Sequence, residues 1–244
     1  MGGRPVRDID KVKERVRKLL NQAADREGTP EGEVFYDRAF EIMAAYGFDE
    51  RDVERPDERD DVVRRTFEFA GAYTDMQAAL LLAIAGALHC TGFQQKLHRS
   101  TRTPSATVFG SARHMQRVEM LYALLNPVMI VGARKHVSEG WYDCSTVVKR
   151  RSFMLGFSQA IGRRLGAAEE TIAETDGRYS LALFDDLRRA EQAQEDYARD
   201  LGLHLTASRA RRTYDGRAYG SGLDAGDRTD LGQERVRSRP ALPR

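Results

Sequence analysis

The sequence of 244 residues has only two cysteines, Cys90 and Cys144, and no long apolar run. Two cysteines exclude a disulfide framework and a four-cysteine zinc site. The most apolar stretch is residues 78–88, and it is much shorter than the run of about 20 residues that a membrane-spanning helix needs. We therefore expect a buried core helix there and no membrane association.

Lysine is scarce too, and neither sign of charge dominates. Six of the 39 basic residues are lysines, which leaves 33 arginines, and 37 acidic residues bring the net charge to +2. A total this close to zero selects no partner by bulk charge. The first residues lack the apolar segment of a secretory signal, so we expect a cytoplasmic protein.

The rest of the composition is that of an ordinary globular protein, because 41% of the residues are hydrophobic and can form a core. Its patterns predict an α+β fold that is predominantly helical. We expect an N-terminal helical hairpin (residues 1–48), an acidic linker (49–61), a helix-rich domain with a small antiparallel sheet (62–232) and a disordered tail (233–244). The linker holds eight acidic residues and three arginines, as solvated spacers often do.

Local patterns place the elements of the larger domain. Short apolar or alternating runs predict strands at residues 63–69, 93–100, 105–109 and 179–184. Helical spacing is clearest over residues 145–168, where four large apolar side chains recur at intervals of four: Phe153, Phe157, Ile161 and Leu165.

Three local signals predict where helices begin and end. Thr74 and Gln77 have the spacing of a capping box that opens a helix, and Gly92 can close that helix. Pro127 is expected to end or kink the next helix, because proline lacks an amide donor and its ring clashes with the preceding turn.

A last helix is predicted over residues 216–231, with Ala218, Gly222 and Gly226 at intervals of four. Glycine costs about 1 kcal/mol relative to alanine inside a helix, so these positions need a compensating reason. A stripe of small side chains lets another backbone approach closely. We therefore expect close packing along this face.

The charge of +2 hides three basic segments, which favour contact with nucleic acid. Residues 134–164 carry a net +5, and residues 91–120 and 201–244 each carry +4. Guanidinium groups bind phosphates in a bidentate manner, and such clusters hold a nucleic-acid backbone without reading its sequence. The candidate phosphate contacts are Arg134, Lys135, Lys149, Arg150, Arg151, Arg163, Arg209, Arg211 and Arg212.

Two other functions stay open. His89 and Cys90 are adjacent and no metal-ligand spacing accompanies them, so we expect no metal ion and no cofactor. A hydrolytic or nuclease-like enzyme is still conceivable if the fold brings together residues such as His89, His98 or His114. In the third alternative, the hairpin of residues 1–48 binds a protein partner.

Two N-terminal segments carry a family resemblance. Ile9-Asp-Lys-Val-Lys with Arg17-Lys-Leu-Leu-Asn-Gln-Ala, and then Ala39-Phe-Glu-Ile-Met-Ala-Ala-Tyr-Gly-Phe, resemble the helical hairpin of the domain-of-unknown-function family 2786. Tyr46-Gly47 matches the family pattern, and Ala45 stands where lysine is usual. Residues 151–165 and 219–228 resemble the family's companion region. The resemblance implies a bacterial or phage relative and no known activity.

Overall fold

A computed structural model of the protein describes residues 61–98, 100–175, 177–206, 213–229 and 231, together with seven isolated positions between 18 and 35. The chain divides into two compact units, and residues 55–228 form the larger one, which is described below. The predicted tail and most of the predicted hairpin and linker lie outside the described residues. The domain boundaries therefore stay predictions.

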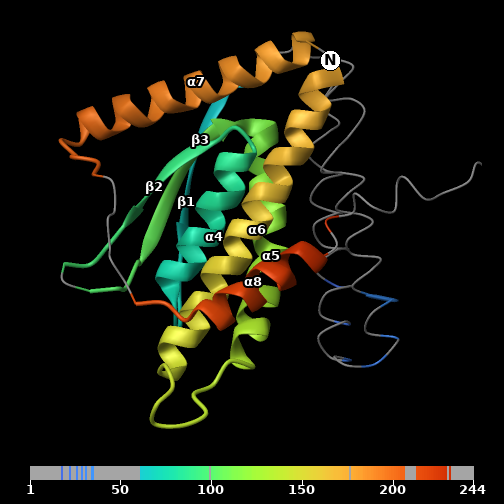
Figure 1. The fold of residues 1–244 in the computed structure, drawn as a ribbon. Helices are drawn as coiled ribbons and strands as arrows, with labels where there is room; N and C mark the ends of the chain where they lie inside the picture. The colour runs from blue at the N-terminus through green and yellow to red at the C-terminus, as the bar shows by residue number, and fades with distance from the viewer. Residues whose placement is uncertain are drawn as a thin grey trace, which may run out of the picture. The chain divides into compact units, whose positions relative to one another are not determined.

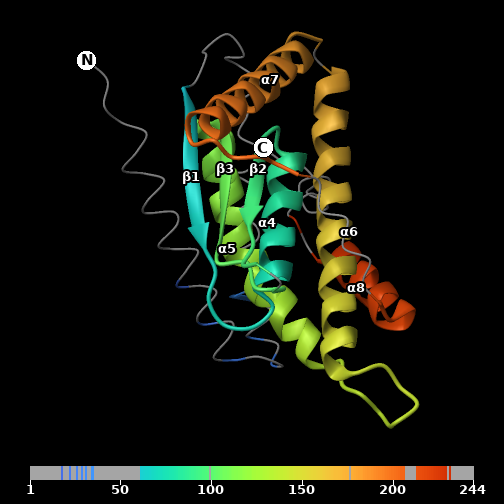
Figure 2. The ribbon, with the colours of Figure 1, turned by 90° about the vertical axis from the view of Figure 1, so that its left-hand side faces the viewer.

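Three antiparallel strands form the sheet of this unit. They are β1 (Val62–Glu68), β2 (Thr91–Gln95) and β3 (Ser105–Ser111), in the order β1-β3-β2. β1 is the strand predicted at 63–69, and β2 and β3 correspond to the strands predicted at 93–100 and 105–109. All seven residues of β3 are buried, so helices cover both faces of the sheet (Figure 2). The predicted fold class is thus confirmed: helices predominate around a small antiparallel sheet.

Helix α7 (Gly177–Asp200) lies across one face of the sheet (Figure 1). The ring centroid of its Tyr197 lies 5.5 Å from that of Phe109 and 6.3 Å from that of Phe93. The strand predicted at residues 179–184 is wrong, because these residues belong to α7. A short apolar run fits a buried helix as well as a strand, and here the helix continues through it.

Helix α5 (Ala112–Arg134) packs on the other face. The ring of Tyr122 meets Phe67 and Phe69 edge-on, with centroids 6.0 and 6.1 Å apart. Phe67 and Phe69, two residues apart, therefore lie on the side of the chain that faces α5. Pro127 lies inside α5 and does not end it. A proline removes one backbone hydrogen bond, and here the helix persists to Arg134 despite that loss.

Helix α4 (Thr74–Ala87) begins where the sequence predicted, but without the capping box. The hydroxyl of Thr74 instead accepts a hydrogen bond from the amide of Thr103 at 3.0 Å. The amide group of Gln77 donates to the carbonyls of Ala70 and Ala72, each at 3.1 Å. Both side chains therefore hydrogen-bond the start of the helix to other segments of the same polypeptide.

The end of α4 also differs from the prediction. The residue with a left-handed backbone is His89, whose φ is 55°, and Gly92 lies in β2. A Cβ at Gly92 would be 2.6 Å from the carbonyl oxygen of Thr107. Glycine at this position thus permits the close approach of β2 to β3.

Helix α6 (Thr146–Thr175) extends the helix predicted over 145–168. It packs against α4 and α5, and its predicted apolar stripe is confirmed, since Phe153, Phe157, Ile161 and Leu165 are all buried.

Helix α8 (Gly216–Arg228) crosses α6 at very short range (Figure 1). A Cβ at Gly222 would lie 2.0 Å from the carbonyl oxygen of Phe153, and one at Gly226 would lie 2.6 Å from the Cβ of Ala160. On the α6 side, a Cβ at Gly156 would lie 2.2 Å from the carbonyl oxygen of Tyr219. The predicted close packing along the small-residue stripe is confirmed.

Candidate functional site

The loop between α5 and α6 brings together four of the predicted basic residues. The Nε of Arg150 donates to the carbonyl of His136 at 3.3 Å, and its Nη2 lies 3.4 Å from the carbonyl oxygen of Arg134. The start of α6 therefore packs beside the end of α5. As a result, Arg134 and Lys135 lie beside Lys149 and Arg150 at the base of this loop, residues 135–145.

Side chains of the loop itself hold its conformation. The two carboxylate oxygens of Asp143 accept hydrogen bonds from the amides of Glu139 and Cys144, at 2.8 and 2.7 Å. Asp143 also forms an ion pair with Lys149. The hydrogen bond from Lys149 lowers the pKa of Asp143 below its usual value, and the same contact raises the pKa of Lys149. This lysine keeps its positive charge while it organises the loop.

The loop extends beyond the ends of α5 and α6 (Figure 2). A turn near its middle carries two aromatic side chains, Trp141 and Tyr142, and we call this turn the tip. Trp141 is 91% exposed and Tyr142 is 97% exposed, and their rings meet edge-on with centroids 6.0 Å apart. Neither residue is among the contacts predicted from the sequence. The signal that could have found them is the adjacent Trp-Tyr pair in a short segment between two basic helix ends.

The predicted residues farther along α6 have other partners. Arg151 forms an ion pair with Asp75 of α4 at 2.8 Å. Arg163 donates from one nitrogen to both carboxylate oxygens of Asp227 on α8, at 2.6 and 2.8 Å. These two arginines fasten α6 to its neighbours. The remaining candidates, Arg209, Arg211 and Arg212, lie outside the described residues.

A second polar cluster surrounds two of the histidines. Glu169 of α6 pairs with Arg117, and its other oxygen lies 3.6 Å from the Nε2 of His89. Asp186 of α7 contacts the Nε2 of His114 at 3.3 Å and accepts a hydrogen bond from Arg113 at 3.1 Å. The two imidazole centroids are 5.8 Å apart. His98, in the turn after β2, belongs to neither group.

Burial and charge set the protonation of this cluster. Burial would raise the pKa of Glu169, but His89 and the charge of Arg117 outweigh it and lower the pKa to about 2. Burial lowers the pKa of His114 below 6.5 despite its contact with Asp186. Only 2% of the His114 side chain is exposed, so a substrate would not reach it without displacing neighbouring elements. This arrangement favours a structural network that joins α6 and α7 to α4 and α5.

The lowered pKa of His114 predicts a pH dependence of stability. The unfolded chain takes up a proton near pH 6.5, whereas His114 in the folded protein does so only at a lower pH. The free energy of unfolding should therefore fall as the pH drops below 6.5. Urea denaturation of His114→Gln between pH 7.5 and 5 should show a smaller dependence of the free energy of unfolding on pH than the wild-type protein. His136, whose pKa burial also lowers, should account for part of the remaining slope. An unchanged slope in the variant would contradict this assignment.

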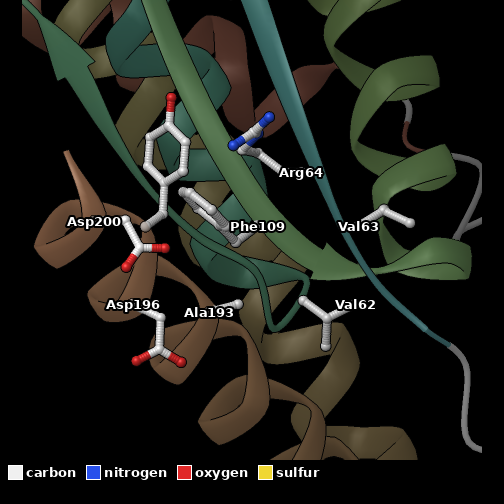
Figure 3. A pocket seen from close by; sticks show the side chains of 8 residues that line it. Val62, Val63, Arg64, Phe109, Ala193, Asp196 and Asp200 are labelled. Carbon is white, nitrogen blue, oxygen red and sulfur yellow. The ribbon is translucent and has the colours of Figure 1, made fainter.

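A cavity of about 350 Å³ lies between β1 and α7. Phe109 and Tyr197 line it, and the guanidinium of Arg64 stacks on the Tyr197 ring at 4.4 Å from its centroid. Figure 3 shows Asp196 and Asp200 on the α7 side, across from Arg64. The cavity thus carries charges of both signs and contains none of the predicted basic residues.

Among the residues that the structure describes, no group of three or more His, Cys, Asp or Glu side chains is placed to hold a metal ion. No helix among these residues is long and apolar enough to cross a membrane.

Comparison with known proteins supports the N-terminal part of the family resemblance. Residues 11–50 match the family described as "Protein of unknown function (DUF2786)". This match does not include residues 151–165 or 219–228, so the companion region stays a prediction. No curated protein and no solved structure matches the chain.

Proposed function

We propose that the protein contacts nucleic acid, free or within a nucleoprotein, through the basic residues at the base of the α5–α6 loop. The observation that carries this proposal is the contact of Arg150 with the backbone of Arg134 and His136. It brings two pairs of basic residues within the segment 134–164, namely 134–135 and 149–150, to one surface.

Arg134 and Lys135 are the cations best placed for phosphate. Both are exposed, and among the described residues no acidic side chain forms an ion pair with either. The charge of Lys149 is compensated by its ion pair with Asp143. Arg150 uses part of its guanidinium for two backbone carbonyls, and within the described part of the chain no carboxylate forms an ion pair with it. The surface therefore offers about three phosphate contacts that do not depend on sequence.

Three phosphate contacts predict a modest salt dependence. For a single strand each contact contributes about −0.7 to the slope of log affinity against log salt, so the slope should be about −2. Affinity should then fall about 20-fold between 50 and 200 mM salt. Fluorescence anisotropy with a labelled oligonucleotide measures this directly. An affinity that does not change with salt would contradict the proposal.

The double variant Arg134→Ala with Lys135→Ala tests the surface itself. Binding at 50 mM salt should weaken about tenfold, and the salt slope should shrink by about 1.4, because two contacts are lost. The matched control is Arg188→Ala with Arg199→Ala, which removes the same charge from the exposed side of α7. Equal weakening by both pairs would show that only net charge matters and would overturn the assignment of the site.

A further inference from the structure

We infer that this site takes unpaired nucleobases, with Trp141 and Tyr142 as the stacking surface and Arg134 and Lys135 as contacts to the adjoining phosphates. The inference rests on the proposed function, which it narrows to single-stranded or locally unpaired nucleic acid. It is carried by a different observation, namely the exposure of two neighbouring aromatic rings.

The exposure of these rings forgoes a large stabilisation. An aromatic side chain buries about 150–250 Å² when it packs into a core or an interface, and Trp141 and Tyr142 are left 91% and 97% exposed. The ring contact of each is with the other. The two rings are nearly perpendicular, with an interplanar angle of 76°. A flat ligand that stacks on the face of one ring therefore meets the edge of the other.

The tip is positioned before any ligand arrives. The amide of Ser138 donates to the hydroxyl of Thr146 at 3.0 Å, and Asp143 accepts from Glu139 and Cys144. These bonds close the loop on both sides of the aromatic pair. A preformed loop loses less conformational entropy on binding than a loose one, so a few contacts suffice for measurable affinity.

The size of the apolar surface points to a base as the occupant. The exposed apolar side chains of the loop and its flanks are Val137, Trp141, Tyr142 and Val147. Four side chains offer far less than the roughly 800 Å² per partner of a standard protein interface. One or two bases need no more than this. Every base has a π-face, and stacking on aromatic side chains is therefore tolerant of sequence.

The charges at the loop favour nucleic acid over a lipid surface. Glu139 lies exposed two residues before Trp141, and a membrane-inserted tip would bring this carboxylate towards apolar chains at high cost. A nucleic-acid strand keeps the carboxylate in water while its phosphates reach Arg134 and Lys135. A duplex hides the faces of its bases in the stack, so it satisfies only the basic half of the site.

The protein contains one tryptophan, so its tryptophan fluorescence reports on Trp141 alone. Titration of the full-length chain with a 12-nucleotide thymidine oligomer at 50 mM salt should quench this fluorescence and shift its maximum. A hairpin duplex of the same phosphate number should bind more weakly and change the fluorescence little. Trp141→Ala should weaken binding of the oligomer about tenfold or more, as loss of one stacked base does, and Trp141→Phe should restore most of it.

Three results would overturn the inference in distinguishable ways. In the first, the oligomer and the duplex bind equally well, Trp141→Ala has no effect and the Arg134/Lys135 double variant binds more weakly. This result would exclude base stacking and leave the proposed function intact. Absence of binding to any nucleic acid at 50 mM salt would remove both. In the third, Trp141 fluorescence changes with vesicles that contain anionic lipid, and the protein does not bind the oligomer. This result would also exclude both proposals and assign the tip to a membrane surface. Unchanged thermal unfolding of Trp141→Ala confirms that the variant is folded.

Discussion

Gly222→Ala is expected to detach α8 from α6 and to destabilise the protein. The new Cβ would lie 2.0 Å from the carbonyl oxygen of Phe153, and no side-chain rotation relieves a clash with a backbone atom. Overpacking of this kind costs about 1–3 kcal/mol, sometimes more, and it exceeds the gain of up to about 1 kcal/mol that alanine brings to a helix. Urea denaturation should show a net loss of about 2 kcal/mol.

Gly220→Ala is the matched control in the same helix. No atom lies within 4 Å of a Cβ at this position, so only the helix propensity changes and stability should rise by up to about 1 kcal/mol. Limited proteolysis after residue 213 locates the effect, because detachment of α8 exposes its backbone to cleavage. Equal stability of the two variants would contradict the packing of α8 on α6.

The second large effect is expected for Glu169→Gln. This change keeps the shape of the side chain and removes the charge that faces Arg117, whose side chain is only 6% exposed. Removal of one partner from a buried ion pair costs about 3–5 kcal/mol, because the other charge stays buried and loses its counter-charge. Urea denaturation at pH 7 should therefore show a loss of about 3 kcal/mol. Glu170→Gln changes the exposed neighbour and should alter stability by less than about 0.5 kcal/mol.

The same carboxylate predicts acid sensitivity of the wild-type protein. Its pKa is about 2 in the folded state against 4.5 for the ordinary group, so the unfolded chain binds the proton first as the pH falls. Stability from this group is present above pH 4.5 and is lost between pH 4.5 and about 2. The variant should lack this part of the pH dependence. A wild-type curve parallel to that of Glu169→Gln over this range would contradict the pairing.

The sequence predicted what depends on local periodicity. The buried stripe of α6 and the small-residue face of α8 follow from spacings of four, since such residues share one side of a helix. The hairpin of β2 and β3 follows from the two short strands predicted at 93–100 and 105–109, which a proline-containing turn connects. These elements are confirmed because the relevant pattern lies within one segment of chain.

The predictions that were wrong share a physical cause, which is contacts with residues outside the local pattern. Thr74 and Gln77 have the spacing of a capping box, but their hydrogen bonds go to Thr103 and to the preceding turn. The run at 179–184 is continuous with a helix whose Tyr197 packs on the sheet. No local pattern reveals which of two compatible structures such contacts select.

The candidate site shows the same division. The sequence shows its basic residues as a cluster of charge. Only the fold shows which of them form ion pairs between helices and which remain at the surface. Arg151 and Arg163 pair with Asp75 and Asp227 across helix interfaces, whereas Arg134 and Lys135 remain at the loop. The pairing partners are 76 and 64 residues away, which no spacing rule connects. The role of the Trp141–Tyr142 tip depends on its exposure, which only the structure gives.

Photo-crosslinking tests the central claim most directly. A single-stranded oligonucleotide with photoreactive thymidines is bound to the full-length protein at 50 mM salt, irradiated, and the modified tryptic peptides are identified by mass spectrometry. Cleavage after Lys135 and Lys149 isolates residues 136–149, the peptide that carries Trp141 and Tyr142. Crosslinks should be concentrated in this peptide in the wild-type protein. They should be reduced in the Arg134/Lys135 double variant, where the same segment is released as residues 118–149 because two cleavage sites are lost. Crosslinks confined to α7, to the β2–β3 hairpin or to other segments would contradict it.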